Sequence, residues 1–126
     1  MTKITCDLNC GNSPKMEFIK EFNIAFAKGN ETFLLDSVTD DIIWSIIGEK
    51  DINGKDKFAN ELREMKGIQA SELKLDSILS HGKYGAANGL MIMPNGEKYA
   101  FSDVYLFSNT KGSKIKTITS YVIKID

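Results

Sequence analysis

The sequence predicts an α+β domain in which three N-terminal helices pack on an antiparallel sheet. The hydrophobic pattern is mostly helical before residue 70 and mostly alternating after it. Short turns separate four strand-like segments in the second half, and such turns join antiparallel neighbours. Helices followed by strands are typical of α+β domains. We therefore expect an N-terminal tail over residues 1–13 and one domain over residues 14–126.

The first helix is expected to begin after Ser13, because serine caps helix N-termini and Pro14 suits the first helical position. Gly29 is expected to end it. Three phenylalanines recur every four residues within it and predict one buried face: Phe18, Phe22 and Phe26.

A short second helix is expected over residues 31–36, capped by Asn30. The β-branched and aromatic run over 42–47 predicts a strand, and residues 48–53 read as a polar loop. The third helix is expected over 55–65. Its predicted buried face consists of Phe58, Ala59, Leu62 and Met65.

Four strands are expected over residues 71–80, 84–93, 97–108 and 114–125. In the first, Leu73, Leu75 and Leu79 are expected to share one face. Both faces of the later strands carry apolar residues, whereas a sheet with one face in water should be polar on that face. We therefore expect a homodimer through the outer face of the sheet.

Charge and composition exclude several classes of protein. Sixteen basic residues stand against 17 acidic ones, and the lysines are scattered, so neither nucleic acid nor a membrane is an expected partner. The first residues contain no apolar segment of a secretory signal, which predicts a cytoplasmic protein. One histidine and two cysteines, Cys6 and Cys10, are too few for a typical metal site. We expect reduced thiols, no metal and no cofactor.

Three stretches carry a family resemblance: residues 18–29, which begin FIKEF; residues 41–58, which contain DIIW and INGKDKF; and residues 103–121, which begin DVYLF. Their order and spacing resemble the nuclear transport factor 2-like superfamily, and within it the SnoaL-like branch, over residues 14–125. The resemblance implies a strongly curved sheet, a cone-shaped α+β barrel with a cavity between sheet and helices. Members include isomerases, cyclases, dehydratases, epoxide hydrolases and binding modules without catalysis, so the fold leaves function open.

Asp103 is the strongest candidate for a catalytic residue. It interrupts an apolar strand between Phe101 and Tyr105, and burial would raise its pKa towards a useful range for a general acid or base. The catalytic aspartate of SnoaL-like cyclases lies on the corresponding strand. The alternative is a hydrogen-bonded structural anchor. His81 is expected at the end of a strand. One interpretation is that Asp103 orients it and the pair abstracts a proton next to a carbonyl group; the other is that it is a solvated turn residue.

The resemblance points the face of Trp44 and Ile46 into the cavity, where the indole offers a stacking surface for a flat ligand. A bulge near residues 116–117 would move Tyr121 between the cavity and the dimer face. The expected ligand-binding residues are Trp44, Ile46, Phe22, Phe58, Leu62, Asn88, Leu90, Phe101, Tyr105 and Tyr121.

The catalytic sets of related enzymes are missing. The first helix has phenylalanines where usual ketosteroid isomerases have a tyrosine. Epoxide hydrolases of this fold use an Asp-Arg-Asp set, but Arg63 is the only arginine and is expected to face solvent. Dehydratases of the scytalone type use paired histidines, and this sequence has a single one. The leading interpretation is therefore a domain that binds a small apolar or aromatic molecule of unassigned identity. The alternatives are an isomerase, cyclase or dehydratase that uses Asp103 on a carbonyl substrate, and a dimeric protein-interaction module.

Overall fold

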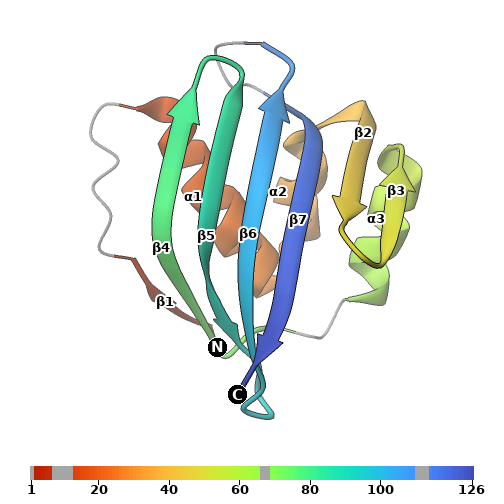
Figure 1. Cartoon of the computed structure of the whole chain (residues 1–126). Coiled ribbons are helices and arrows are strands. Elements are labelled where there is room, and N and C mark those ends of the chain that lie inside the picture. The colour runs from red at the N-terminus through yellow and green to blue at the C-terminus, as the bar shows by residue number, and fades with distance from the viewer. Residues whose placement is uncertain (1, 7–12, 66–68, 110–113) are drawn as a thin grey trace.

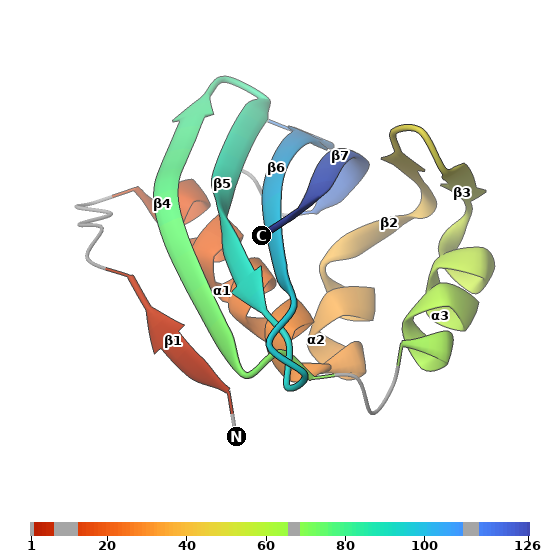
Figure 2. The ribbon, with the colours of Figure 1, turned by 60° about the horizontal axis from the view of Figure 1, so that its bottom comes forward.

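A computed structural model describes residues 2–6, 13–65, 69–109 and 114–126. Three helices pack on a seven-stranded sheet of order β1-β4-β5-β6-β7-β2-β3. The elements are β1 (Lys3–Thr5), α1 (Pro14–Lys28), α2 (Glu31–Asp36), β2 (Val38–Ile46), β3 (Lys50–Asn53), α3 (Lys55–Glu64), β4 (Glu72–His81), β5 (Tyr84–Ile92), β6 (Lys98–Phe107) and β7 (Ile115–Ile125). The helices lie on one side of the sheet, which curves around them (Figures 1 and 2). The predicted α+β class is confirmed.

The helix ends follow the capping residues. The Ser13 hydroxyl accepts a hydrogen bond from the Met16 N–H at 3.2 Å, and Gly29 ends α1 in the left-handed conformation with φ of 73°. Asn30 caps α2 through the Phe33 N–H. Within the described residues no helix is long and apolar enough to cross a membrane.

The antiparallel meander from β4 to β7 forms as predicted. Two further strands lie where the sequence indicated a loop and a tail. β3 pairs antiparallel with β2, placing Ile52 opposite Trp44, and β1 pairs parallel with β4. Each is too short to show an alternating pattern of its own. The tail residue Cys6 is half-buried, and Cys10 lies outside the described residues.

A bulge in β4 corrects the predicted face of that strand. The register with β5 shifts between Leu75 and Ser77, so that Asp76 has no partner in the ladder. Beyond it the alternation is reversed. Ile78 is therefore buried, and Leu79, predicted to share the face of Leu75, is 66% exposed.

The inward face of β5 is also the opposite of the predicted one. Gly85, Ala87 and Gly89 are the buried residues of β5, and a Cβ atom added at Gly85 would lie 2.4 Å from the Ile19 side chain of α1. Small residues therefore let the helix approach the strand closely. Asn88 and Leu90 alternate with these residues and belong to the outer face, not to the cavity side as expected.

Candidate functional site

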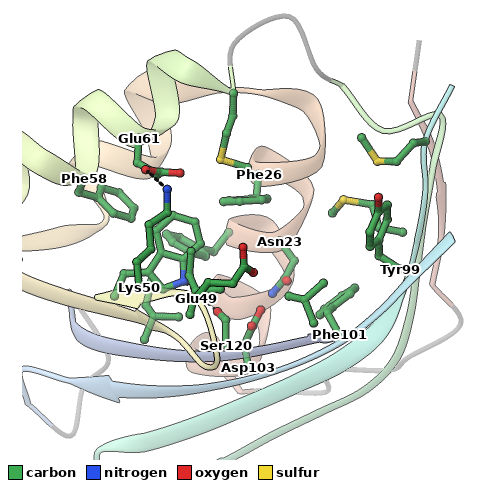
Figure 3. Close-up of a pocket in the computed structure, with 18 of the residues that line it drawn as sticks. Asn23, Phe26, Glu49, Lys50, Phe58, Glu61, Tyr99, Phe101, Asp103 and Ser120 are labelled. Carbon is green, nitrogen blue, oxygen red and sulfur yellow. Dashed lines mark hydrogen bonds and ion pairs between the residues drawn. The ribbon is translucent and has the colours of Figure 1, made fainter. Parts of the chain in front are cut away.

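A cavity of about 710 Å³ lies between the helices and the concave side of the sheet. Figure 3 shows its side chains converging from β2, β3, β6, β7, α1 and α3. Seven aromatic residues contribute to the lining: Phe22, Phe26, Trp44, Phe58, Tyr99, Phe101 and Tyr105. Its polar and charged residues are Asn23, Glu49, Lys50, Glu61, Asn95, Glu97, Asp103 and Ser120.

Asp103 lies in the middle of β6, where it pairs with Ser120 on β7 and Ala87 on β5. Its carboxylate is half-buried and points into the cavity from the sheet, next to Ser120 (Figure 3). The register shift between β6 and β7 leaves Lys116 as the extra residue. That bulge turns Ser120 towards the cavity and its neighbour Tyr121 towards the outer face.

Two hydroxyl groups donate hydrogen bonds to Asp103. The Tyr105 hydroxyl lies 3.2 Å from Oδ2 of Asp103, and Ser120 supplies the second hydrogen bond. The oxygens of these two hydroxyl groups each accept a hydrogen bond from a further side chain. The Asn23 amide nitrogen donates to the Tyr105 oxygen at 3.0 Å and to the Ile19 carbonyl at 2.9 Å, and Trp44 Nε1 donates to the Ser120 oxygen at 2.9 Å.

Burial raises the pKa of Asp103 to about 6, although the hydrogen bonds from Ser120 and Tyr105 act in the opposite direction. Burial, together with the nearby charge of Asp103, holds the pKa of Tyr105 well above its ordinary value. Tyr105 therefore remains a hydrogen-bond donor at neutral pH, while Asp103 changes its charge close to neutrality.

The cavity mouth is charged. Lys50 on β3 forms an ion pair with Glu61 on α3, with 3.0 Å between Nζ and Oε1 (Figure 3). Glu49 is exposed beside Lys50. On the opposite side, Glu97 pairs with Lys124 at 2.5 Å, and this ammonium group and the Asn95 amide hold the pKa of Glu97 below its usual value.

Six of the predicted ligand-binding residues contribute to the cavity lining: Phe22, Trp44, Ile46, Phe58, Phe101 and Tyr105. Leu62 instead borders a separate cavity of about 70 Å³ behind Phe26 and Met65. Asn88 and Tyr121 lie in a hollow on the outer face, and Leu90 belongs to neither cavity wall. They were assigned to the cavity because the inward faces of β5 and β7 were misjudged.

The structure does not bring His81 to Asp103. His81 is exposed at the end of β4, paired with Tyr84 at the turn into β5, and it is absent from the cavity lining. Within the described residues, no group of three or more His, Cys, Asp or Glu side chains is placed to hold a metal ion.

Sequence reasoning missed Asn23 and Ser120, which complete the hydrogen-bond network. Asn23 had a visible signal, because it is a polar residue next to Phe22 on the buried side of a helix. Ser120 had none, because its direction depends on the bulge at Lys116. Lys50 and Glu61 were missed because they come from β3 and α3, whose approach to the cavity is a tertiary feature.

No protein-family model and no curated protein matches this chain. Solved structures do. An NTF2-like protein of unknown function from Cytophaga hutchinsonii is 28% identical, with a TM-score of 0.63 over 86% of this chain and 99% of that one. An LEH-like epoxide hydrolase from M. tuberculosis is 18% identical, with a TM-score of 0.73 over 86% and 82%. The epoxide hydrolase/cyclase-like enzyme SalBIII, which acts in pyran ring formation in the polyether salinomycin, is 15% identical, with a TM-score of 0.73 over 86% and 90%.

Proposed function

We propose that this chain, which has the nuclear transport factor 2-like fold, binds a small and mostly apolar molecule in its cavity through a hydrogen bond to Asp103. The observation that carries the proposal is the cavity of about 710 Å³, with aromatic walls and one compact polar cluster. Small-molecule sites commonly combine an apolar enclosure with a few converging polar groups. The polar cluster fixes the orientation of the molecule, and the rings supply contact area.

Ligand binding is tested with 2-naphthol, a flat apolar molecule with one hydroxyl donor. Trp44 is the only tryptophan and lies in the cavity wall, so its fluorescence reports occupancy. We expect saturable quenching, weakened roughly 10-fold or more in Asp103→Leu, since a hydrogen bond to a charged group contributes about 1.5–3 kcal/mol. Asp76→Asn, a carboxylate change on the exposed bulge of β4, serves as the control. Quenching that does not saturate, or that is equal in Asp103→Leu, contradicts the proposal.

A second function, acid–base catalysis, is favoured by the pKa of Asp103 at about 6. A carboxylate that titrates near neutral pH is suited to exchange protons with a bound substrate. Two structural neighbours, an epoxide hydrolase and an epoxide hydrolase/cyclase-like enzyme, are themselves enzymes, although the reactions in their names differ from the one proposed here. Asp103 would take a proton from the carbon beside a carbonyl group, the C–H electron pair would move towards the carbonyl oxygen to give an enolate, and a proton exchanged with solvent would return from Asp103 to the carbon.

Proton exchange between 2-tetralone and D₂O, followed by NMR, tests the catalytic function. We expect the protein to accelerate exchange with a rate that rises through pH 6, and Asp103→Asn to remove about 10²-fold or more of the acceleration. Asp76→Asn should keep it. Equal exchange rates with and without Asp103 would leave ligand binding as the whole function.

The chain is also proposed to form a homodimer through the outer face of β4–β7. This face exposes Leu79 and Ile123 by 66% and 65%. A hollow of about 320 Å³ lies between them, and none of its lining residues is charged. A second copy of the same sheet would cover these side chains symmetrically.

A further inference from the structure

We propose that the molecule taken by this cavity is a hydrophobic cation, an amine whose ammonium group pairs with Asp103. The inference rests on the proposed binding function and names the class of ligand. It is carried by three observations: the direction of the hydrogen bonds around Asp103, the sign of the charges in the cavity lining, and the aromatic walls.

Every described hydrogen-bond donor in the cluster around Asp103 is already used. The two N–H groups of the Asn23 amide go to Ile19 and Tyr105, and the Trp44 N–H goes to Ser120. The hydroxyl protons of Tyr105 and Ser120 go to Asp103 itself. A carboxylate has about four acceptor positions, so two remain for a ligand. The cluster therefore offers acceptors and no donor, and it suits a ligand group that donates.

The charges of the lining favour a positive ligand over a negative one. Four carboxylates contribute to it, those of Glu49, Glu61, Glu97 and Asp103, together with one ammonium group, that of Lys50. Lys50 is paired with Glu61 at 3.0 Å. Glu97 is paired with Lys124, which lies outside the lining, so the negative charge left in the described lining is that of Asp103 and the exposed Glu49. Within the described lining, no cation is left to meet an anionic ligand. A cleft lined mainly by one sign of charge attracts the opposite sign.

The aromatic walls add to this preference. The ring of Phe22 lies 6.0 Å from that of Tyr105, and the ring of Phe26 lies 5.7 Å from that of Trp44; all four residues line the cavity that contains the polar cluster. Aromatic faces attract organic cations, and the attraction increases when water is excluded. A neutral compound gains no comparable attraction to the rings, because it carries no positive charge.

Three naphthalene probes with similar rings test the charge preference: 1-naphthylmethylamine as the cation, 1-naphthalenemethanol as the neutral probe and 1-naphthoate as the anion. By calorimetry at pH 7.5 we expect the amine to bind about 10-fold or more tightly than the alcohol, with naphthoate weakest. Asp103→Asn should remove the preference for the amine. Asp76→Asn should keep it.

The pH dependence in the unmodified protein provides a second measurement, which does not depend on the folding of a variant. Below pH 6 the amine should lose affinity as Asp103 is protonated, by up to about tenfold per pH unit. The alcohol should lose less affinity over the same pH range, because it has no charge to pair with Asp103 and can still hydrogen-bond to the protonated carboxyl group. The other titratable groups of the lining are Glu49, Glu61, Glu97, Lys50, Tyr99 and Tyr105. Glu97→Gln at the mouth reports the contribution of a distant carboxylate and should reduce amine affinity by only about two- to threefold.

The outcomes separate the two proposals. If none of the probes binds, the proposed binding function fails and this inference fails with it. If the alcohol binds as tightly as the amine, or naphthoate binds most tightly, the cavity binds small molecules and the assignment to cations is overturned. A preference for the amine that survives in Asp103→Asn also overturns it, because the ammonium group would then pair elsewhere.

Discussion

At the scale of single residues, the balance of forces on Asp103 is the main feature of the molecule. Burial disfavours its charged form, while the hydroxyls of Tyr105 and Ser120 favour it. Burial is the larger effect, so the folded protein holds the Asp103 proton more tightly than the unfolded chain does. Charging this residue at neutral pH therefore lowers the stability of the fold.

The first prediction concerns stability against pH in Asp103→Asn. The pKa of Asp103 in the folded protein, about 6, lies above its ordinary value of 3.8, so the stabilising contribution is complete below pH 3.8 and is lost as pH rises through 6. Two pH units correspond to a few kcal/mol, which partial exposure reduces to about 1–2 kcal/mol. The free energy of unfolding, measured with urea at pH 4 and at pH 7.5, should fall by about 1–2 kcal/mol more in the original chain than in Asp103→Asn as the pH is raised. A constant difference would mean that Asp103 titrates normally.

The second prediction concerns Tyr105→Phe. Removing this hydroxyl takes a hydrogen bond from Asp103, so its pKa should rise above 6. It also leaves one N–H of the buried Asn23 without its acceptor, at a cost of about 1–3 kcal/mol. Carboxyl ¹³C NMR and urea unfolding measure the two effects. Tyr121→Phe, on the exposed outer face, should change neither, and an unchanged Asp103 titration in Tyr105→Phe would show that the hydroxyl donates elsewhere.

At the scale of elements, the glycines of β5 determine how closely neighbouring structure approaches. A Cβ atom added at Gly89 would lie 2.0 Å from the backbone carbonyl oxygen of Lys74 on β4. That contact lies beside the bulge at Asp76.

The third prediction concerns Gly89→Ala. Because the added methyl group meets backbone and not a flexible side chain, strand β4 must move, at a cost of about 1–3 kcal/mol. Urea unfolding should show this loss, with Asn88→Ala on the outer face as a near-neutral control. Equal stability of the two variants would mean that the bulge adjusts freely.

Much of the fold could be predicted from local signals. Serine, proline, asparagine and glycine marked the ends of α1 and α2, and alternation marked the four long strands. The directions of side chains beyond a bulge could not be predicted, because one extra residue reverses the alternation. Asp103 was found because it interrupts an apolar face in a regular strand. Ser120 and Tyr121 exchanged places because they follow the bulge at Lys116.

At the scale of the whole molecule, the outer face of the sheet leaves several large apolar side chains exposed, among them Leu79, Tyr121 and Ile123. Its central residues alternate with those that line the cavity, so one sheet supplies both the cavity wall and the proposed dimer surface. Changes on one face should therefore leave the other in place.

The fourth prediction is that Ile123→Glu converts the proposed dimer to a monomer, since it places a charge in an uncharged apolar interface. Sedimentation equilibrium should give twice the chain mass for the original protein and the single mass for the variant. Ile47→Glu places the same charge at an exposed site outside the outer hollow and should remain dimeric. A monomeric original chain at about 100 μM would exclude this dimer.

The position of β7 within the sheet has a consequence for folding. β7 lies between β6 and β2, and it pairs Ile118 with Trp44, far apart along the chain. During synthesis, β2, β3 and α3 emerge early but have no sheet to join until β7 follows. Contacts between such distant segments form slowly. β7 also carries Ser120. The pairing of β7 with β2 and the polar cluster beside Asp103 are therefore completed in the same late step.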